Sequence, residues 1–224
     1  MTVQRSLSPG EYYHVFNRGA HRFGILKDKN DVIRFLFEIL YFQSPITFRK
    51  ISRLSGSFSD KDGFPIPNES IEKVLKERSV ELVAFCIMPN HFHLLVREIR
   101  EGGISAYMQR VAEGYTKYFH AKYKASGHVF QGRYKAIRIK DDEQLMQLSA
   151  YIHRNPRELA TWKGKEEHYP WSSLQDFTMA NRWGGLIVPD IIVSRFDATP
   201  NSNYADFVRT SPAKLLEEEF GTAS

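Results

Sequence analysis

The chain has 224 residues, 42% of them hydrophobic, with one cysteine and a formal net charge of +5. A single thiol excludes an internal disulfide framework. The absence of a leader peptide and of any apolar run near about eighteen residues predicts a cytoplasmic protein without a membrane partner. The pI near 9.2 favours a polyanionic partner, and the length suits one domain with additions.

The N-terminal part predicts a strand at residues 12–17 and a helix over 31–42. The stretch that follows, 44–80, is dense in turn formers, and within it residues 55–67 predict a mobile loop. A short helix at residues 71–75 is the regular element expected there. We therefore expect a long surface connection between the first helix and the next strand.

Two adjacent strands at 81–88 and 92–98 are predicted around the sequence that carries His91 and His93. Side chains at positions i and i+2 of a strand lie on the same face, so the two imidazoles can share one metal ion. The same triplet is also typical of two half-buried strand histidines that bind nothing. Cys86, in the first of these strands, is expected to pack rather than react.

A long helix at 103–124 and a strand at 128–139 come next. The helix is amphipathic, and its tyrosines, Tyr115, Tyr118 and Tyr123, are expected to be core or groove residues. Cations and aromatic rings alternate along this stretch, which is typical of surfaces that bind single-stranded nucleic acid, although an ordinary solvated basic face has the same pattern. The residues concerned are Arg110, Lys117, Lys122, Tyr123, Lys124, Phe130, Arg133, Tyr134, Lys135, Arg138 and Lys140.

The last predicted element of the core is a helix at residues 142–155, with acidic residues in its first turn. Tyr151 and Asn155, four positions apart, lie on one face of this helix, about 5–6 Å apart at Cβ. Pro156 disfavours helical geometry at Asn155, so the pair occupies the last turn. Leucine and isoleucine side chains form an adjacent apolar stripe, so Tyr151 is expected at the edge of the core, directed at a polar group.

These elements follow the order β-α-β-β-α-β and then a further helix, which predicts an α+β fold with a ferredoxin-like antiparallel sheet backed by helices. The strand that carries His91 and His93 is expected to be central, with both histidines on the face opposite the core-packing helices and Tyr151 above that face. We expect residues 1–175 to form the main domain and residues 176–224 to form a C-terminal extension that packs on it.

Five short motifs stand out along the chain: residues 13–19 (YHVFNRG), 86–93 (CIMPNHFH), 127–135 (GHVFQGRYK), 151–156 (YIHRNP) and 169–173 (YPWSS). In order and spacing they resemble the HUH single-strand transposases of the insertion-sequence-200 type, in particular their REP-associated tyrosine transposase branch. The likeness spans most of residues 10–175. The stretch 44–80 departs from the short connection typical of the family, and it is either a neutral surface insertion or a contact for a DNA hairpin.

The resemblance implies a transposase, a single-strand endonuclease and strand transferase that cleaves and rejoins DNA at hairpin-flanked sites through a 5′-phosphotyrosine. It implies that Tyr151 is the nucleophile and that His91, His93 and Asn155 bind a divalent metal, Mg²⁺ or Mn²⁺. The residues expected to bind nucleic acid are Arg18, Arg133, Tyr134, Lys135 and Arg138. The partner would be single-stranded DNA with a hairpin, bound by a monomer or a homodimer, between which the sequence does not decide.

Two other functions stay open at this point. One is a non-catalytic module that binds structured single-stranded nucleic acid on the same kind of sheet. The other is a metal-dependent phosphoesterase with a water nucleophile. In that second alternative, Tyr151 would be dispensable for cleavage, which separates it from a tyrosine transesterase.

Overall fold

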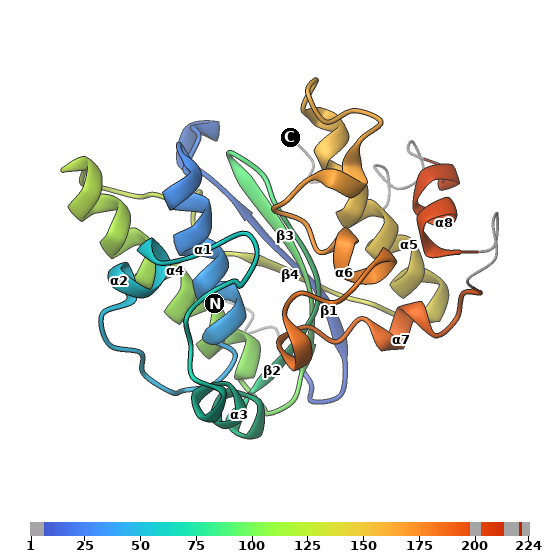
Figure 1. Ribbon diagram of the computed structural model, residues 1–224, viewed down its shortest axis with the longest axis horizontal. Coiled ribbons are helices and arrows are strands. Elements are labelled where there is room, and N and C mark those ends of the chain that lie inside the picture. The colour runs from blue at the N-terminus through green and yellow to red at the C-terminus, as the bar shows by residue number, and fades with distance from the viewer. Residues whose placement is uncertain (1–6, 198–202, 213–219, 221–224) are drawn as a thin grey trace, which may run out of the picture.

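A computed structural model describes residues 7–197, 203–212 and 220 of the chain. Within these residues, four strands form one antiparallel sheet in the order β2-β3-β1-β4 (Figure 1). The strands are β1 (Tyr12–Arg18), β2 (Val80–Ile87), β3 (His91–Glu98) and β4 (Lys135–Arg138). β1 and β3 are central, and the order of the elements along the chain confirms the predicted ferredoxin-like α+β fold.

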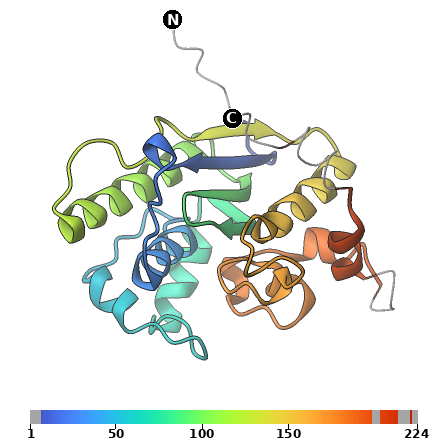
Figure 2. The ribbon, with the colours of Figure 1, turned by 90° about the horizontal axis from the view of Figure 1, so that it is seen from above.

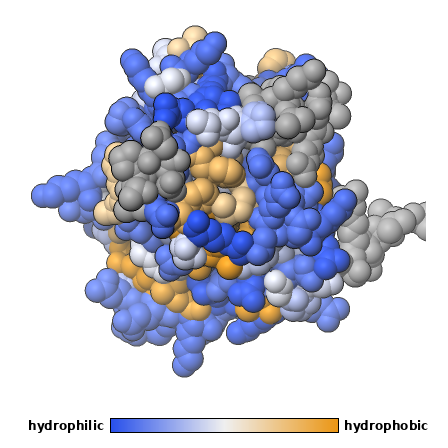
Figure 3. All heavy atoms as spheres, turned by 90° about the vertical axis from the view of Figure 1, so that its right-hand side faces the viewer, coloured by the Kyte–Doolittle hydropathy of each residue, from blue (hydrophilic) through white to orange (hydrophobic). Residues whose placement is uncertain are grey.

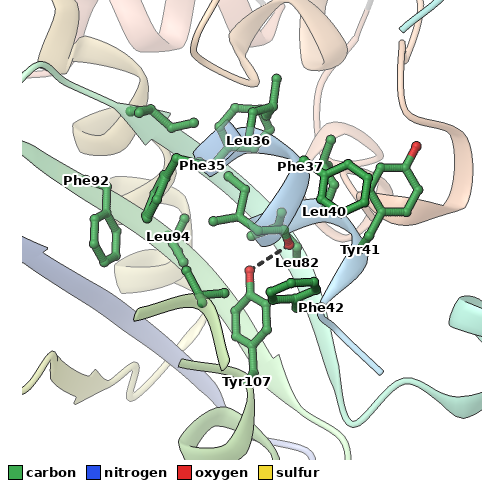
Figure 4. Close-up of a cluster of buried hydrophobic side chains, with 14 of the residues drawn as sticks. Phe35, Leu36, Phe37, Leu40, Tyr41, Phe42, Leu82, Phe92, Leu94 and Tyr107 are labelled. Carbon is green, nitrogen blue, oxygen red and sulfur yellow. Dashed lines mark hydrogen bonds between the residues drawn. The ribbon is translucent and has the colours of Figure 1, made fainter. Parts of the chain in front are cut away.

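One face of the sheet is covered by α1 (Lys29–Tyr41) and α4 (Gly103–Tyr123), which lie side by side (Figures 1 and 2). α1 begins at a capping box, in which the side chains of Asp28 and Asp31 each accept from the other's backbone N–H. The core between these helices and the sheet is rich in aromatic rings (Figure 4). The buried Tyr107 hydroxyl donates to a carbonyl of α1 at 2.7 Å, so its polar atom is satisfied inside the core.

The other face is covered by α5 (Asp142–Arg154), with the shorter α6 (Leu174–Thr178), α7 (Asp190–Val193) and α8 (Tyr204–Thr210) outside it (Figure 2). Because helices cover both faces, β2 and β3 bury nearly all of their side chains, which explains their almost continuous apolar runs. The outer surface of this second layer is largely hydrophilic around a central apolar area (Figure 3).

The last strand is shorter than the sequence predicted. β4 covers only Lys135–Arg138, so the prediction of a strand is wrong for residues 128–134. Gly132 has a φ of 71°, in the left-handed region, and Gln131 before it donates to the Arg18 carbonyl at 2.8 Å. The chain therefore crosses the end of β1 and turns at a glycine before it can pair as a strand.

The connection before β2 contains two helices, α2 (Ile51–Gly56) and α3 (Asn68–Glu77), so the helix predicted there is present and longer. The segment between them, expected to be a mobile loop, has two buried side chains, Phe64 and Ile66, while most of its other side chains are exposed. A closed turn spans residues 59–63, and the buried Phe64 ring lies 5.3 Å from that of Phe37. Aromatic packing at irregular spacing anchors this segment, which periodicity does not detect.

The outer edge of β2 is covered by the segment 169–173. Ile87 donates to the Trp171 carbonyl at 2.9 Å, and Ser173 donates to the Phe85 carbonyl at 3.0 Å. An edge strand with unpaired backbone groups is a site for unwanted pairing, so this segment protects the sheet.

The remaining described chain consists of loops and 3-10 turns. The turns lie at Ala20–Arg22, Asn155–Glu158, Glu166–His168 and Gly184–Leu186. Among all the residues that the structure describes, no helix combines the length and hydropathy required to span a bilayer.

Candidate active site

β3 presents His91 and His93 on the sheet face that α5 covers, opposite α1 and α4. On the neighbouring β1, strand alternation places His14 and Arg18 on that same face, and Arg18 is the register partner of His91. The rings of His91 and His93 are 5.1 Å apart between centroids, at 83°. His93 is 1% exposed and His91 is 8% exposed. The structure thus places the two imidazoles on one face, as their spacing predicts.

α5 brings Tyr151 and Asn155 over these histidines. The carboxylate of Asp141 caps the first turn of the helix, and Asn155 follows its last residue. The Tyr151 ring lies 5.2 Å from the His93 ring, at 84°. Asn155 Nδ2 donates to the Tyr151 carbonyl at 2.9 Å, and its Oδ1 lies 3.2 Å from His91 Nε2. The four residues predicted from two distant motifs therefore meet at one place.

Both histidines use their Nδ1 atoms within the protein. His91 Nδ1 lies 2.7 Å from Asn90 Oδ1. His93 Nδ1 lies 2.8 Å from the Nε2 of His14, the histidine of β1. The Nε2 atoms are therefore the nitrogens that remain for a ligand, an arrangement typical of metal-binding histidines with supporting hydrogen bonds.

Burial lowers the pKa of both histidines. For His91 it is the largest cause, and the hydrogen bond with Asn155 partly opposes it; for His93, burial is reinforced by the neighbouring His14, His91 and Arg18. Burial also lowers the pKa of His14 to about 3. All three imidazoles are neutral near pH 7, so each keeps one ring nitrogen with a lone pair.

The contacts of His91 indicate a position for a cation. Both ring nitrogens face an amide oxygen, so the single proton of the neutral imidazole can satisfy only one of them; on Nδ1, it is donated to Asn90 Oδ1. Its Nε2 lone pair then faces Asn155 Oδ1, which is also an acceptor, at 3.2 Å. Two ligands of an octahedral Mg²⁺, each about 2.1 Å from the ion and at right angles, are about 3.0 Å apart. These residues therefore fit a divalent ion.

The donor set is unlike that of a closed structural zinc site. Among the described residues, no group of three His, Cys, Asp or Glu side chains could hold a metal ion. Two imidazoles and one amide oxygen leave positions for water and substrate oxygens, which suits a hard or borderline ion. Cys86 is fully buried, and burial raises the pKa of its thiol, as expected of a cysteine that packs.

The tyrosines of α4 lie on the opposite face of the sheet, and their hydroxyls have other partners. Tyr115 donates to the Ile25 carbonyl at 2.6 Å. Tyr118 and Tyr123 donate to the carboxylate of Asp31 at 3.1 and 2.7 Å. Tyr151 is therefore the tyrosine beside the histidines, and the prediction that the α4 tyrosines serve the core and its rim agrees with these contacts.

Three of the residues predicted to bind nucleic acid lie at the β4 edge of the sheet. Arg133, Tyr134 and Lys135 line a cavity of about 1010 Å³ on the α4 side, whose floor is apolar. The Tyr134 hydroxyl lies 3.1 Å from Ser105 Oγ of α4. Lys135 Nζ lies 5.8 Å from the centre of the Phe16 ring, which is on the histidine face. Lys135 is thus placed between the cavity and the histidines.

The two other predicted residues differ in their surroundings. Arg18 lies beside His91, close enough for its charge to lower the pKa of that imidazole. Arg138 forms a two-bond ion pair with Glu11, at 2.8 and 3.1 Å, at the solvent-exposed edge.

Two cations of the basic face expected along α4 have partners within the protein. Lys122 binds the carboxylates of Asp28 and Asp31, both at 2.6 Å. Arg110 donates to backbone carbonyls after α1, among them Ile46 at 2.7 Å. These partners are more than sixty residues away in sequence, so the charge pattern of the helix alone does not reveal them.

Two buried histidines have side-chain partners in the structure that the sequence analysis did not predict. One is His14, within the first motif. The other is His153, whose Nδ1 lies 2.7 Å from the Tyr204 hydroxyl and whose Nε2 lies 2.8 Å from Ser173 Oγ. His153 thus ties α5 to the segment along β2 and to α8. The sequence signal that could have drawn attention to His153 is its position two residues after Tyr151.

Replacing His153 with alanine is expected to lower the free energy of unfolding by about 3 kcal/mol, because it leaves a cavity and removes two buried hydrogen bonds, to Tyr204 and to Ser173. Denaturant unfolding would measure this. The control His168→Ala removes an exposed histidine and should change the value by less than about 0.5 kcal/mol. Equal stability of the two variants would contradict the role of His153.

Comparisons with known proteins agree with the motifs. Residues 58–155 match the model of a family described as "Transposase IS200 like". A solved structure described as the REP-associated tyrosine transposase bound to a REP hairpin is similar, with 15% identity and a TM-score of 0.52 over 85% of this chain and 92% of that chain. At this identity the structural likeness shows the fold. None of the curated proteins is significantly similar in sequence.

Proposed function

Starting from the match of residues 58–155 to the IS200-like transposases, we propose that the protein cleaves and rejoins single-stranded DNA by tyrosine transesterification. The observation that carries the proposal is the meeting of Tyr151 with His91, His93 and Asn155. The Tyr151 ring lies 5.2 Å from His93, and Asn155 Oδ1 lies 3.2 Å from His91 Nε2. The proposal assigns the nucleophile's role to Tyr151 and the metal-ligand roles to the three residues around it.

In this proposal His91 Nε2, His93 Nε2 and Asn155 Oδ1 hold Mg²⁺ or Mn²⁺. When bound, such an ion supplies Lewis acidity to a non-bridging oxygen of the scissile phosphate. Asn90 and His14 hold the two rings in place through their Nδ1 atoms. The hydrogen bond from Asn155 to the Tyr151 carbonyl couples the ligand to the helix turn that carries the nucleophile.

The covalent step is a phosphodiester exchange. The Tyr151 phenol loses its proton, its oxygen bonds to phosphorus, and the bond from phosphorus to the 3′-oxygen of the preceding nucleotide breaks. That oxygen takes a proton and leaves as a free 3′-hydroxyl, while the following nucleotide stays linked to Tyr151 through its 5′-phosphate. The reverse step joins strands without a nucleotide cofactor, because one phosphodiester replaces another. A phenol with an ordinary pKa near 10 needs a nearby positive charge for this, and Arg18 lies beside the site.

The proposal is tested with the wild-type protein and hairpin-containing single strands labelled at either end, with Mn²⁺ or with EDTA, on a denaturing gel. We expect a metal-dependent covalent adduct that carries the 3′-end label and not the 5′-end label. Cleavage without an adduct would favour a phosphoesterase that uses water. Binding without cleavage of any strand would favour a non-catalytic module.

The double variant Arg133→Ala, Lys135→Ala is expected to weaken binding of single-stranded DNA and to flatten its salt dependence. Each phosphate contact contributes a slope of about 0.7 in log K against log[salt], so the loss of two contacts reduces the slope by about 1.4. The control Lys73→Ala, Lys76→Ala removes the same charge from the exposed side of α3. Equal slopes for the two double variants would contradict a DNA contact at the β4 edge.

A further inference from the structure

We propose that His14 is a positioning residue that holds His93 in the ring tautomer whose Nε2 can bind a metal ion. This inference rests on the proposed function, because it requires His93 to be a metal ligand. None of the sequence motifs assigned a role to His14, and it does not contact the reacting atoms in the proposed step.

The pair is rigidly placed within the sheet. His14 of β1 lies diagonally across from His93 of the adjacent β3, on the same face, because the register partner of His93 is Phe16, two residues along β1. Their rings are stacked, 5.1 Å apart between centroids at 24°, and His14 Nε2 lies 2.8 Å from His93 Nδ1. The exposed fractions of the two side chains are 0% and 1%, so water does not compete for this hydrogen bond.

One shared proton decides whether His93 can be a ligand. A neutral imidazole carries a single N–H. If His14 donated the proton between the rings, the proton of His93 would lie on its Nε2 and block ligation there. If His93 donates from Nδ1, its Nε2 keeps the lone pair that a metal requires. His14 must therefore act as the acceptor in the metal-bound protein.

His91 shows the same arrangement with a different supporting residue. Its Nδ1 lies 2.7 Å from Asn90 Oδ1, which can only accept. Both candidate ligands thus have Nδ1 engaged and Nε2 left, although their supports come from separate parts of the chain. A chance packing of two histidines would not reproduce this pattern on both rings.

A second observation concerns the free ring nitrogen of His14. His14 Nδ1 has no hydrogen-bond partner among the described residues, and it is buried. When His14 accepts from His93, its own proton lies on that unpartnered Nδ1, which is unfavourable for a buried N–H. The reverse direction would relieve that atom, but it would place the single proton of His93 on the Nε2 that has to bind the metal. Metal binding to His93 Nε2 offsets this penalty.

The first test measures Mn²⁺ affinity, from the electron paramagnetic resonance signal of the free ion, for three proteins at one pH. His14→Phe keeps an aromatic ring without an acceptor, and we expect the Kd for Mn²⁺ to rise about 10- to 100-fold. His14→Gln keeps an acceptor at the same reach, and we expect a Kd within about threefold of wild type. The control His168→Phe changes an exposed histidine and should leave the Kd unchanged.

Unchanged affinity in His14→Phe would overturn the inference and leave the proposed function intact. Absence of Mn²⁺ binding by the wild-type protein would overturn the metal-dependent function, and the inference with it. DNA binding in EDTA, equal to that of wild type, identifies variants that have kept their fold.

The second test needs no variant. Long-range ¹H–¹⁵N spectra of the imidazole rings distinguish a protonated ring nitrogen from one with a lone pair. In wild-type protein loaded with Zn²⁺ as a diamagnetic probe, we expect the Nδ1 of His93 to be protonated and its Nε2 to carry the metal shift. An unprotonated His93 Nδ1 in the loaded protein would overturn the inference, even if the His14 variants failed to fold.

Discussion

Replacing Tyr151 with phenylalanine is expected to abolish the covalent protein–DNA adduct while leaving DNA affinity within about twofold of wild type. The substitution removes one hydroxyl and keeps the ring, which packs 5.2 Å from His93, 5.9 Å from His14 and 5.9 Å from Phe220. Loss of a nucleophile lowers the rate by at least about 10⁴-fold in well-studied enzymes. The measurement is the rate of adduct formation on a denaturing gel at saturating DNA.

The chain supplies matched controls for this experiment. Tyr118→Phe and Tyr123→Phe also remove one tyrosine hydroxyl each, but these lie on the opposite face of the sheet and bind Asp31. Both variants should form the adduct at rates close to wild type. An adduct that persists in Tyr151→Phe and disappears in one of these would transfer the nucleophile's role to α4. Metal-dependent cleavage at an unchanged rate in Tyr151→Phe would support a water nucleophile.

His91→Ala and His93→Ala are each expected to remove cleavage together with its dependence on metal. Lewis-acid stabilisation of a phosphoryl oxygen is worth several kcal/mol, so we expect a rate lower by about 10³-fold or more. The measurement is the adduct rate as a function of Mn²⁺ concentration. The His91 variant is easier to interpret, because His91 is the first residue of β3 and is 8% exposed, whereas His93 is 1% exposed and its loss also leaves a cavity.

Two observations guard against a trivial loss of folding in these variants. DNA binding in EDTA should stay close to wild type, because neither histidine is among the residues proposed to bind phosphates. His168→Ala, at an exposed histidine, should keep both the rate and its metal dependence. Metal-stimulated cleavage that survived in both His91→Ala and His93→Ala would contradict the proposed ligand set.

The elements that position the site were predictable because their signals are local. The ranges expected from hydrophobic period and capping residues agree within a few residues with β1, α1, β2, β3, α4 and α5. Asn155 keeps helical dihedral angles, φ −49° and ψ −37°, contrary to the expectation from Pro156. The strand over 128–139 was overestimated because apolar and aromatic residues continue through Gly132, where the backbone turns. The burial of Phe64 in the turn-rich connection before β2 was not predicted, because the Phe37 ring that it contacts is distant in sequence.

The geometry of the candidate site was predictable in two halves. His91 and His93 share a face because a strand alternates with a period of two, and Tyr151 and Asn155 share a face because a helix repeats every 3.6 residues. That the two halves meet was expected from the family resemblance and from the order of elements. Their 3.2 Å contact, between Asn155 and His91, is a property of the packed structure.

The sequence by itself determined the order of strands and helices, the pairing of residues on single strand or helix faces, and the likeness to IS200-like transposases. Only the tertiary structure decided which groups support or neutralise one another. His14 reaches His93 across 79 positions of sequence, and Lys122 reaches Asp31 across 91. Local periodicity orients a side chain relative to its own element, whereas hydrogen bonds and ion pairs between elements depend on how those elements pack. The partner of a buried proton or charge is therefore set by the fold.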